Sequence, residues 1–139
     1  MKMRKIVAAL LLLSLFCACF AACGETTEPL SGEYMGPKGE RYIFTKRTLT
    51  ITGVIEGLDD TSLRCSYRIV TEADGTERMT VTRESYQYTG IDPNVKSMIN
   101  DYNTAIDSAN GSARQVEYVL KRAESYIMLD DLWLMKDVD

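Results

Sequence analysis

Histidine is absent from this 139-residue sequence, and proline occurs only three times. Without imidazole, a Ser-His-Asp triad, a Cys-His dyad and a His-ligated zinc site are all excluded. The chain also lacks the Gly-x-x-x-x-Gly-Lys phosphate loop, the Gly-x-Gly-x-x-Gly dinucleotide motif and the Ser-x-x-Lys pair of acylating serine enzymes. These absences predict a protein that is not an enzyme and that holds neither a cofactor nor a metal ion.

Long apolar runs are missing everywhere except at the start of the chain. There, basic residues at positions 2, 4 and 5 precede a run from Ile6 to Ala22 that is apolar except for Ser14. A basic start, an apolar middle and small residues before a polar stretch are typical of a secretory signal peptide, here residues 1–22. The alternative is an uncleaved transmembrane helix, because crossing a bilayer core takes about 20 apolar residues.

The apolar run ends in Phe20-Ala21-Ala22-Cys23. This segment resembles the lipobox of bacterial lipoproteins, although Phe20 stands where that family most often has leucine. The resemblance implies cleavage after Ala22 and a diacylglyceryl thioether on Cys23, with fatty acyl chains such as palmitate. Cys19 is a poorer candidate, since apolar residues follow it where a polar tether should begin. We therefore expect a protein lipid-anchored to the extracytoplasmic face of the cell membrane, with a polar tether over residues 23–30 and one domain over 31–139.

Basic residues are few in the expected mature chain. Removing residues 1–22 leaves 13 of the 16 basic residues against 20 acidic ones, a formal charge of −7. Nucleic acid is therefore not an expected partner, because binding it requires Lys and Arg at the phosphates. With Cys23 lipidated, Cys65 has no disulfide partner, and its alternating apolar neighbours predict a buried small hydrophobe. A reactive thiol at Cys65 is the alternative.

Apolar residues recur with period two through the first part of the expected domain, which predicts half-buried strands. The alternating sets are Tyr42 and Phe44, Leu49 and Ile51, Leu63 to Ile69, Met79 and Val81, and Tyr86 and Tyr88. Asp74-Gly75 predicts a tight hairpin turn in which both residues take positive φ. Asp59-Asp60 and Asp130-Asp131 also indicate turns.

The period changes at Asp92-Pro93, which predicts an N-cap followed by proline in the first helical turn. One apolar face then predicts an amphipathic helix over 93–109, ended by Asn110-Gly111. That face consists of Val95, Met98, Ile99, Tyr102, Ile106 and Ala109. Residues 113–129 fit either a helix or strands. We favour strands, since a single-helix insert in a meander leaves fewer strands unpaired.

The sum is a mainly β chain of about eight short antiparallel strands with one amphipathic helix. Such a meander forms a small barrel or a sandwich, and closure into a barrel removes exposed strand edges. The segments Gly32-Glu33-Tyr34, Tyr42-Ile43-Phe44 and Leu132 to Lys136 resemble small lipocalin-like lipoproteins of Gram-positive bacteria. The resemblance implies a lipocalin-like fold and brings no site residues with it.

Candidate binding residues are aromatic. Tyr86 and Tyr88, together with Trp133, could line the mouth of a ligand site, while packing in or on the sheet is the alternative. The carboxylates of residues 72–77 surround Gly75 but do not match a calcium loop, so a hairpin tip is expected there.

We expect a non-catalytic protein that binds a small ligand, an envelope component or a partner protein at the membrane surface. One alternative is an inhibitor or immunity-type protein that engages an enzyme through an exposed loop such as 53–62. Another is a cell-envelope hydrolase with paired carboxylates. An apolar cavity inside the barrel would favour the first function, a protruding loop on a filled core the second, and convergent carboxylates in a cleft the third.

Overall fold

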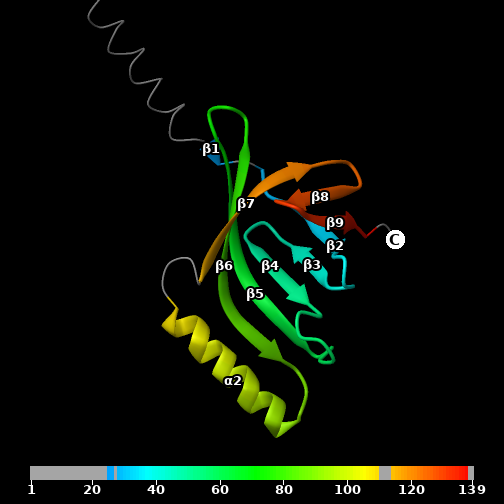
Figure 1. Cartoon of the computed structure of the whole chain (residues 1–139), viewed down its shortest axis with the longest axis vertical. Helices are drawn as coiled ribbons and strands as arrows, with labels where there is room; N and C mark the ends of the chain where they lie inside the picture. Colours follow the sequence, from blue (N-terminus) through cyan, green and yellow to red (C-terminus); the bar gives the residue numbers. More distant parts are fainter. Residues whose placement is uncertain (1–24, 27, 110–113, 138–139) are drawn as a thin grey trace, which may run out of the picture.

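The strands of this protein pair in sequence order and close on themselves (Figure 1). The computed structural model describes residues 25–26, 28–109 and 114–137. Among these, β2 to β9 form an antiparallel meander in which β9 pairs back with β2. The elements are β1 Glu25–Thr26, β2 Gly32–Met35, β3 Arg41–Phe44, β4 Thr48–Thr52, β5 Thr61–Thr71, β6 Glu77–Tyr88, α2 Pro93–Ser108, β7 Gln115–Arg122, β8 Tyr126–Leu129 and β9 Leu132–Lys136. The predicted lipocalin-like barrel with one helix is confirmed, and the sandwich alternative is wrong.

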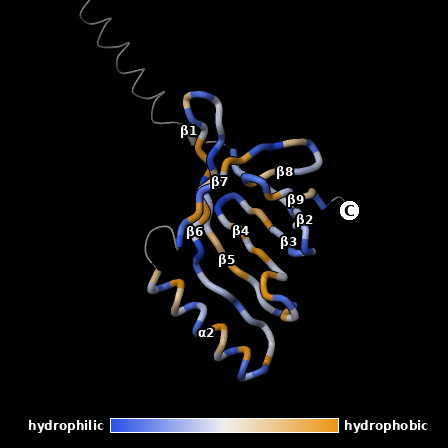
Figure 2. Tube along the Cα trace, viewed as in Figure 1, coloured by the Kyte–Doolittle hydropathy of each residue, from blue (hydrophilic) through white to orange (hydrophobic). Residues whose placement is uncertain are grey.

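Alternating side chains fill the barrel interior, as the period of two predicts. Along β5, Arg64 and Arg68 are exposed on the outer face. The inward residues of the same strand, which are all buried, are Leu63, Cys65, Tyr67 and Ile69. Figure 2 shows hydrophobic and hydrophilic residues alternating in this way along the chain and around α2.

One end of the barrel, called the closed end below, is filled by aromatic side chains. The ring of Phe44 meets the rings of Tyr34 and Tyr67 edge-on, with centroids 5.7 and 5.4 Å away. The Tyr67 hydroxyl lies 2.9 Å from the carbonyl oxygen of Leu30 and 2.5 Å from that of Thr45. Edge-to-face rings and a satisfied hydroxyl are the usual way in which tyrosine is accommodated in a core.

The described residues of the expected polar tether over 23–30 are attached to the barrel at two places. The β1 backbone pairs with Val70 and Thr71 near the end of β5, and Leu30 is buried in the closed end. The reason is that β5 extends past β4, which pairs with it only over residues 62–66. β1 takes up the strand edge that would otherwise be left unpaired.

The β5–β6 hairpin turns differently from the prediction. The N–H of Gly75 donates to the carbonyl of Glu72 over 3.0 Å, and Gly75 has φ 88°. Asp74 does not have positive φ, so the predicted turn with two such residues is wrong. Its carboxylate instead accepts a hydrogen bond from the N–H of Thr76 at 2.9 Å, which supports a longer loop with one left-handed glycine.

The turn between β8 and β9 is the predicted two-residue turn at Asp130-Asp131. Leu129 and Leu132 pair directly across it. Asp130 has φ 54° and is the only non-glycine residue with positive φ in the described part of the chain. Asp tolerates this conformation better than most residues, because its short side chain can hydrogen-bond locally.

The helix begins as predicted. The Asp92 carboxylate accepts a hydrogen bond from the N–H of Asn94 at 2.9 Å, and Pro93 occupies the first turn. The helix ends at Ser108, because Ala109 is already extended, and the predicted glycine stop at Gly111 lies outside the described residues. β7 and β8 confirm strands in the part of segment 113–129 that the structure describes.

Candidate ligand-binding cavity

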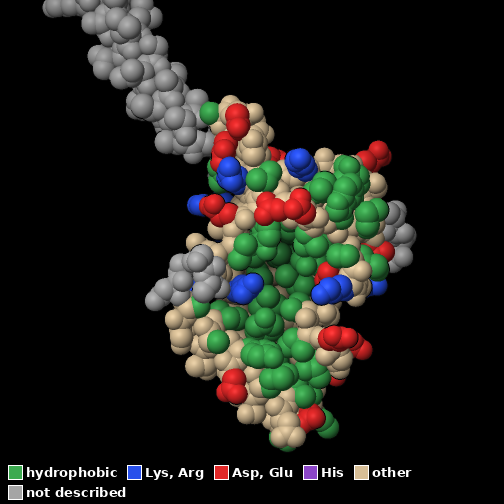
Figure 3. All heavy atoms as spheres, viewed as in Figure 1, with side chains coloured by type: hydrophobic (Ala, Val, Ile, Leu, Met, Phe, Trp, Pro, Cys, Tyr) green, Lys and Arg blue, Asp and Glu red, His purple; other side chains and the backbone are tan. Residues whose placement is uncertain are grey.

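The barrel end opposite the closed end contains a cavity of about 1000 Å³. Cavities that bind small molecules commonly have volumes of about 300–1000 Å³. Figure 3 shows the molecule hollowed over the barrel, with hydrophobic side chains lining the hollow. The lining residues are Pro37, Lys38, Gly39, Glu40, Tyr42, Leu49, Ile51, Gly53, Val54, Ile55, Glu56, Gly57, Asp59, Leu63, Cys65, Val81, Arg83, Tyr86, Val116, Tyr118, Leu129 and Leu132.

Short side chains at several inward positions contribute to the hollow in this half of the barrel. The interior of an eight-stranded barrel is just wide enough for large side chains to fill it. At the closed end the inward positions carry rings and Met79, which is fully buried. Towards the open end, Cys65, Val81 and Val116 take the corresponding positions and line the cavity. Their short side chains leave the centre of the barrel open.

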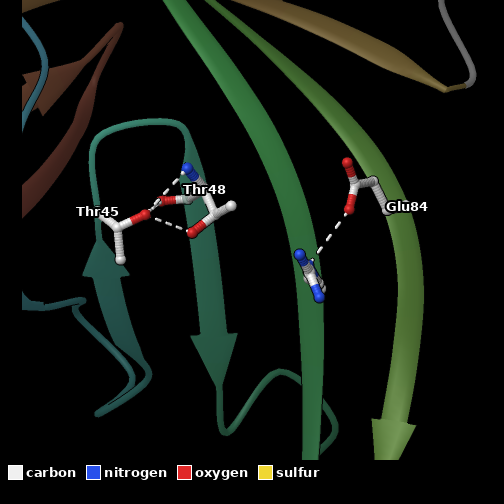
Figure 4. A network of polar contacts seen from close by, with 4 residues as sticks. Thr45, Thr48 and Glu84 are labelled. Carbon is white, nitrogen blue, oxygen red and sulfur yellow. Dashed lines mark hydrogen bonds and ion pairs between the residues drawn. The ribbon is translucent and has the colours of Figure 1, made fainter.

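A β-bulge directs one aromatic ring into the cavity wall. The register of β5 and β6 shifts so that Cys65 faces Arg83 while Arg64 faces Ser85, which leaves Glu84 as the extra residue. The Glu84 carboxylate lies 3.4 Å from the guanidinium Nε of Arg64, on the outer face of the sheet (Figure 4). Because the bulge shifts the inward positions by one residue, Tyr86 points inward.

Figure 4 also shows how the β3–β4 turn is closed at the other end of the barrel. The N–H of Thr48 donates to the Thr45 hydroxyl over 3.2 Å, and the N–H of Thr45 donates to the carbonyl of Thr48 over 2.9 Å. These bonds close a short turn beside the filled core, whereas longer loops surround the cavity at the open end.

Helix α2 covers the edge of β6 beside the cavity. β7 pairs with β6 as far as Thr82, and the N–H of Arg83 still donates to the carbonyl of Arg114 over 3.0 Å, so residues 84–88 lie beyond the reach of β7. Asn103 of α2 accepts a hydrogen bond from the N–H of Tyr86 at 2.6 Å and donates one to its carbonyl at 3.0 Å. The side-chain amide thereby replaces a neighbouring strand. The ring of Tyr102 lies 5.5 Å from that of Tyr86 and extends the aromatic wall.

Besides Tyr86, the phenol groups of Tyr42 and Tyr118 line the cavity. Burial and, to a smaller extent, the nearby Glu40 carboxylate together raise the pKa of Tyr42 to about 12. Burial also raises the pKa of Tyr118, against the opposing effect of the Arg83 guanidinium. Neither hydroxyl has a hydrogen-bond partner among the described residues. At neutral pH both phenols therefore remain protonated and can donate hydrogen bonds to a ligand.

Cys65 lies between these groups and is 1% exposed. Burial raises the pKa of its thiol to about 11, while the Arg83 guanidinium lowers it and Glu84 raises it by smaller amounts. The thiol is therefore neutral at physiological pH, whereas a reactive cysteine is a thiolate. The prediction of a buried small hydrophobe is confirmed.

Charged side chains line the cavity both on its strand wall and on the loops around it. Arg83 belongs to the β6 wall, whereas Lys38 and the acidic residues lie on the β2–β3 and β4–β5 loops. These acidic residues are Glu40, Glu56 and Asp59. The segment 53–62, expected to include a protruding loop, contributes several lining residues, so it forms part of the cavity wall.

The structure separates the three aromatic residues that the sequence suggested as a ligand site. The cavity lining contains Tyr86 but, among the described residues, neither Tyr88 nor Trp133. The Tyr88 hydroxyl accepts a hydrogen bond from the N–H of Asp92 at 3.1 Å. Trp133 is 49% exposed and its ring lies 4.7 Å from that of Tyr126 on the outer face of the sheet. Cys23 lies outside the described residues.

Tyr42, Tyr118 and Arg83 are the cavity residues that the sequence analysis missed. A signal for Arg83 exists, because it follows Met79 and Val81 at the inward period of the strand. A charged residue at such a position indicates either a strand end or a functional group inside the barrel. The two tyrosines carry no comparable signal, since tyrosine is common in strands.

Within the described ranges, no group of three or more Cys, Asp or Glu side chains is arranged to hold a metal ion. The carboxylates of the suspected hairpin tip have other partners, since Glu72 pairs with Arg78 and Asp74 accepts from Thr76. In the same described part of the chain, no helix has the length and apolar character needed to cross a membrane.

The sequence matches no protein-family model, and no curated protein or solved structure is significantly similar to it.

Proposed function

We propose that this protein is a non-catalytic binding protein whose barrel holds a small, largely apolar ligand. The observation that carries this proposal is the cavity of about 1000 Å³ at the open end. Aliphatic and aromatic residues make up more than half of its lining, and the charged and phenolic groups occupy separate positions among them. This combination is typical of small-molecule sites, in which apolar surface supplies affinity and a few polar groups supply orientation.

We further propose that the protein acts at the extracytoplasmic face of the cell membrane through a lipid on Cys23. The basic start, the apolar run and the lipobox-like Phe20-Ala21-Ala22-Cys23 support this location. One acyl chain binds a membrane only marginally, whereas two or more give stable attachment. The acidic mature chain would itself be repelled by anionic lipids, so the acyl chains would have to supply the attachment.

The cavity favours ligand binding over the two alternative functions. An inhibitor would be expected to display a loop on a filled core, but the β4–β5 loop lines a hollow. A glycosidase-type hydrolase needs two carboxylates facing one another across a cleft. The acidic residues here lie on the β2–β3 and β4–β5 loops, while the strand walls carry apolar groups and Arg83.

A neutral fluorescent dye tests the proposal directly. We expect N-phenyl-1-naphthylamine to bind the protein purified from cells that express the full chain, with a rise in dye fluorescence. Val116→Trp should weaken binding about tenfold or more, equivalent to about 1.4 kcal/mol, because the indole fills part of the cavity.

Val119→Trp is the matched control, since Val119 lies on β7 but is absent from the cavity lining among the described residues. It should leave dye binding unchanged. Equal affinity for both variants and the wild type, or no binding at all, would overturn the proposal.

A further inference from the structure

Among the arginines of the barrel strands, only Arg83 and the outward-facing Arg68 have no carboxylate partner in the described part of the chain, and of these two Arg83 lines the cavity. Four arginines, Arg41, Arg64, Arg78 and Arg122, each pair with a carboxylate. Arg83 lines the cavity opposite the buried Cys65, and among the described residues no acidic side chain lies at ion-pair distance from it. A guanidinium beside an apolar wall with no protein anion is available to bind an anionic group of a ligand.

The neighbouring polar groups of the wall are hydrogen-bond donors. Tyr42 and Tyr118 line the same cavity, and their phenols remain protonated well above neutral pH because burial raises the pKa of each. The Arg83 guanidinium opposes the burial-driven rise in the pKa of Tyr118, which indicates that the two groups interact. A guanidinium with protonated phenols offers donors to an oxyanion.

The mouth of the cavity has the opposite character. On the loops around it, Glu40, Glu56 and Asp59 outnumber Lys38, and this excess of negative charge repels small free anions. An oxyanion would therefore need an apolar chain to be retained. Each methylene group that is buried improves affinity about fourfold, so a chain of moderate length outweighs this repulsion.

We infer that the cavity binds an amphipathic anion, with its apolar chain against the aliphatic walls and its carboxylate or phosphate group on Arg83. This inference rests on the proposed function and specifies the class of ligand. The alternative class that the rim carboxylates would suit is an amphipathic cation, and the experiment below separates the two.

Calorimetric titration with ligands of one chain length tests the inference. The ligands are dodecanoate, dodecyl phosphate, dodecanol and dodecylamine, with acetate as the anion without a chain. We expect dodecanoate or dodecyl phosphate to bind at least about tenfold more tightly than dodecanol, and acetate not to bind. The tighter of the two anions identifies the head group.

Arg83→Met should weaken binding of the preferred anion about 10- to 100-fold while leaving dodecanol binding unchanged. Unchanged dodecanol binding shows that the cavity of the variant is intact. If Arg83→Met does not fold, Arg83→Lys provides the test, since it should retain more affinity for the anion than Arg83→Gln. The control Arg68→Met removes an equal charge from the outer face of β5 and should have no effect.

Equal binding of dodecanoate, dodecyl phosphate and dodecanol would overturn the inference while leaving the proposed function intact. Tighter binding of dodecylamine would do the same and would assign recognition to the acidic rim. Failure of all four ligands together with N-phenyl-1-naphthylamine would overturn both.

Discussion

The hydroxyl of Tyr67 binds the N-terminal segment to the closed end of the barrel through the carbonyl of Leu30. The variant Tyr67→Phe removes only that hydroxyl. It lies within hydrogen-bond distance of the carbonyls of Leu30 and Thr45, at 2.9 and 2.5 Å. The first bond links residues 37 positions apart in the sequence. The phenylalanine ring would keep its edge contact with Phe44, so the variant leaves no cavity behind.

The expected loss in free energy of unfolding follows from the number of hydrogen bonds that one hydroxyl can donate. A hydroxyl donates to one acceptor at a time, so the variant loses about one hydrogen bond, worth about 0.5–1.5 kcal/mol net. A buried carbonyl left without a donor costs about 1–3 kcal/mol. Because Thr45 is exposed at its turn, water can reach its carbonyl, whereas the Leu30 bond is buried. We expect the free energy of unfolding to fall by about 1–2 kcal/mol, between these two limits.

Urea unfolding of the wild type and the variant, followed by circular dichroism, measures this difference. Tyr126→Phe is the matched control, because the Tyr126 hydroxyl has no hydrogen-bond partner among the described residues. The control should change the free energy of unfolding by less than about 0.5 kcal/mol. A Tyr67→Phe variant that is no less stable than Tyr126→Phe would refute the role assigned to the Tyr67 hydroxyl.

Three further predictions follow from other parts of the chain. Cys23→Ser should release the protein from the membrane fraction of cells, and mass spectrometry of the wild type should show the added mass of a lipid. Retention of the variant in the membrane fraction would indicate an uncleaved apolar helix instead. Asn103→Leu should lower the free energy of unfolding by about 1–3 kcal/mol, since it leaves the N–H and carbonyl of Tyr86 unpaired, whereas Asn100→Leu on the exposed face of α2 should not. Burial raises the pKa of Cys65 from 9.0 to about 11 and that of Tyr42 from 10.0 to about 12, so both groups hold their protons longer in the folded state than in the unfolded one. The free energy of unfolding should therefore be independent of these groups below pH 9 and fall as the pH rises above 9. The variant Cys65→Ala should remove the part of this fall that occurs between pH 9 and about 11. Urea midpoints of the wild type that stay constant through that pH range would contradict this prediction.

The elements of the barrel were predictable because each is encoded locally. Alternating apolar residues specify strands, and Asp92-Pro93 specifies where the helix begins. The outward position of Trp133 was also encoded, since Leu132 and Leu134 flank it at the inward period. Its aromatic character suggested a ligand contact, but strand periodicity determines which face a side chain occupies.

The cavity was not predictable in the same way. Its volume depends on side chains that meet across the barrel, such as Tyr42 and Tyr118, which are far apart in the sequence. The bulge at Glu84 arises from the register between two strands, and it changes which face Tyr86 occupies. Neither property belongs to a local segment, so the residue pattern alone cannot specify it.

If Cys23 carries a lipid as proposed, the position of β1 determines which end of the barrel faces the bilayer. Only Gly24 separates Cys23 from Glu25, and two residues of chain span at most about 7 Å. β1 pairs with Val70 and Thr71, at the end of β5 farthest from the cavity mouth. A lipid on Cys23 would thus place the closed end of the barrel near the lipid headgroups, with the cavity mouth facing away from the bilayer. A ligand would then enter the cavity from the aqueous surroundings of the cell and not directly from the bilayer.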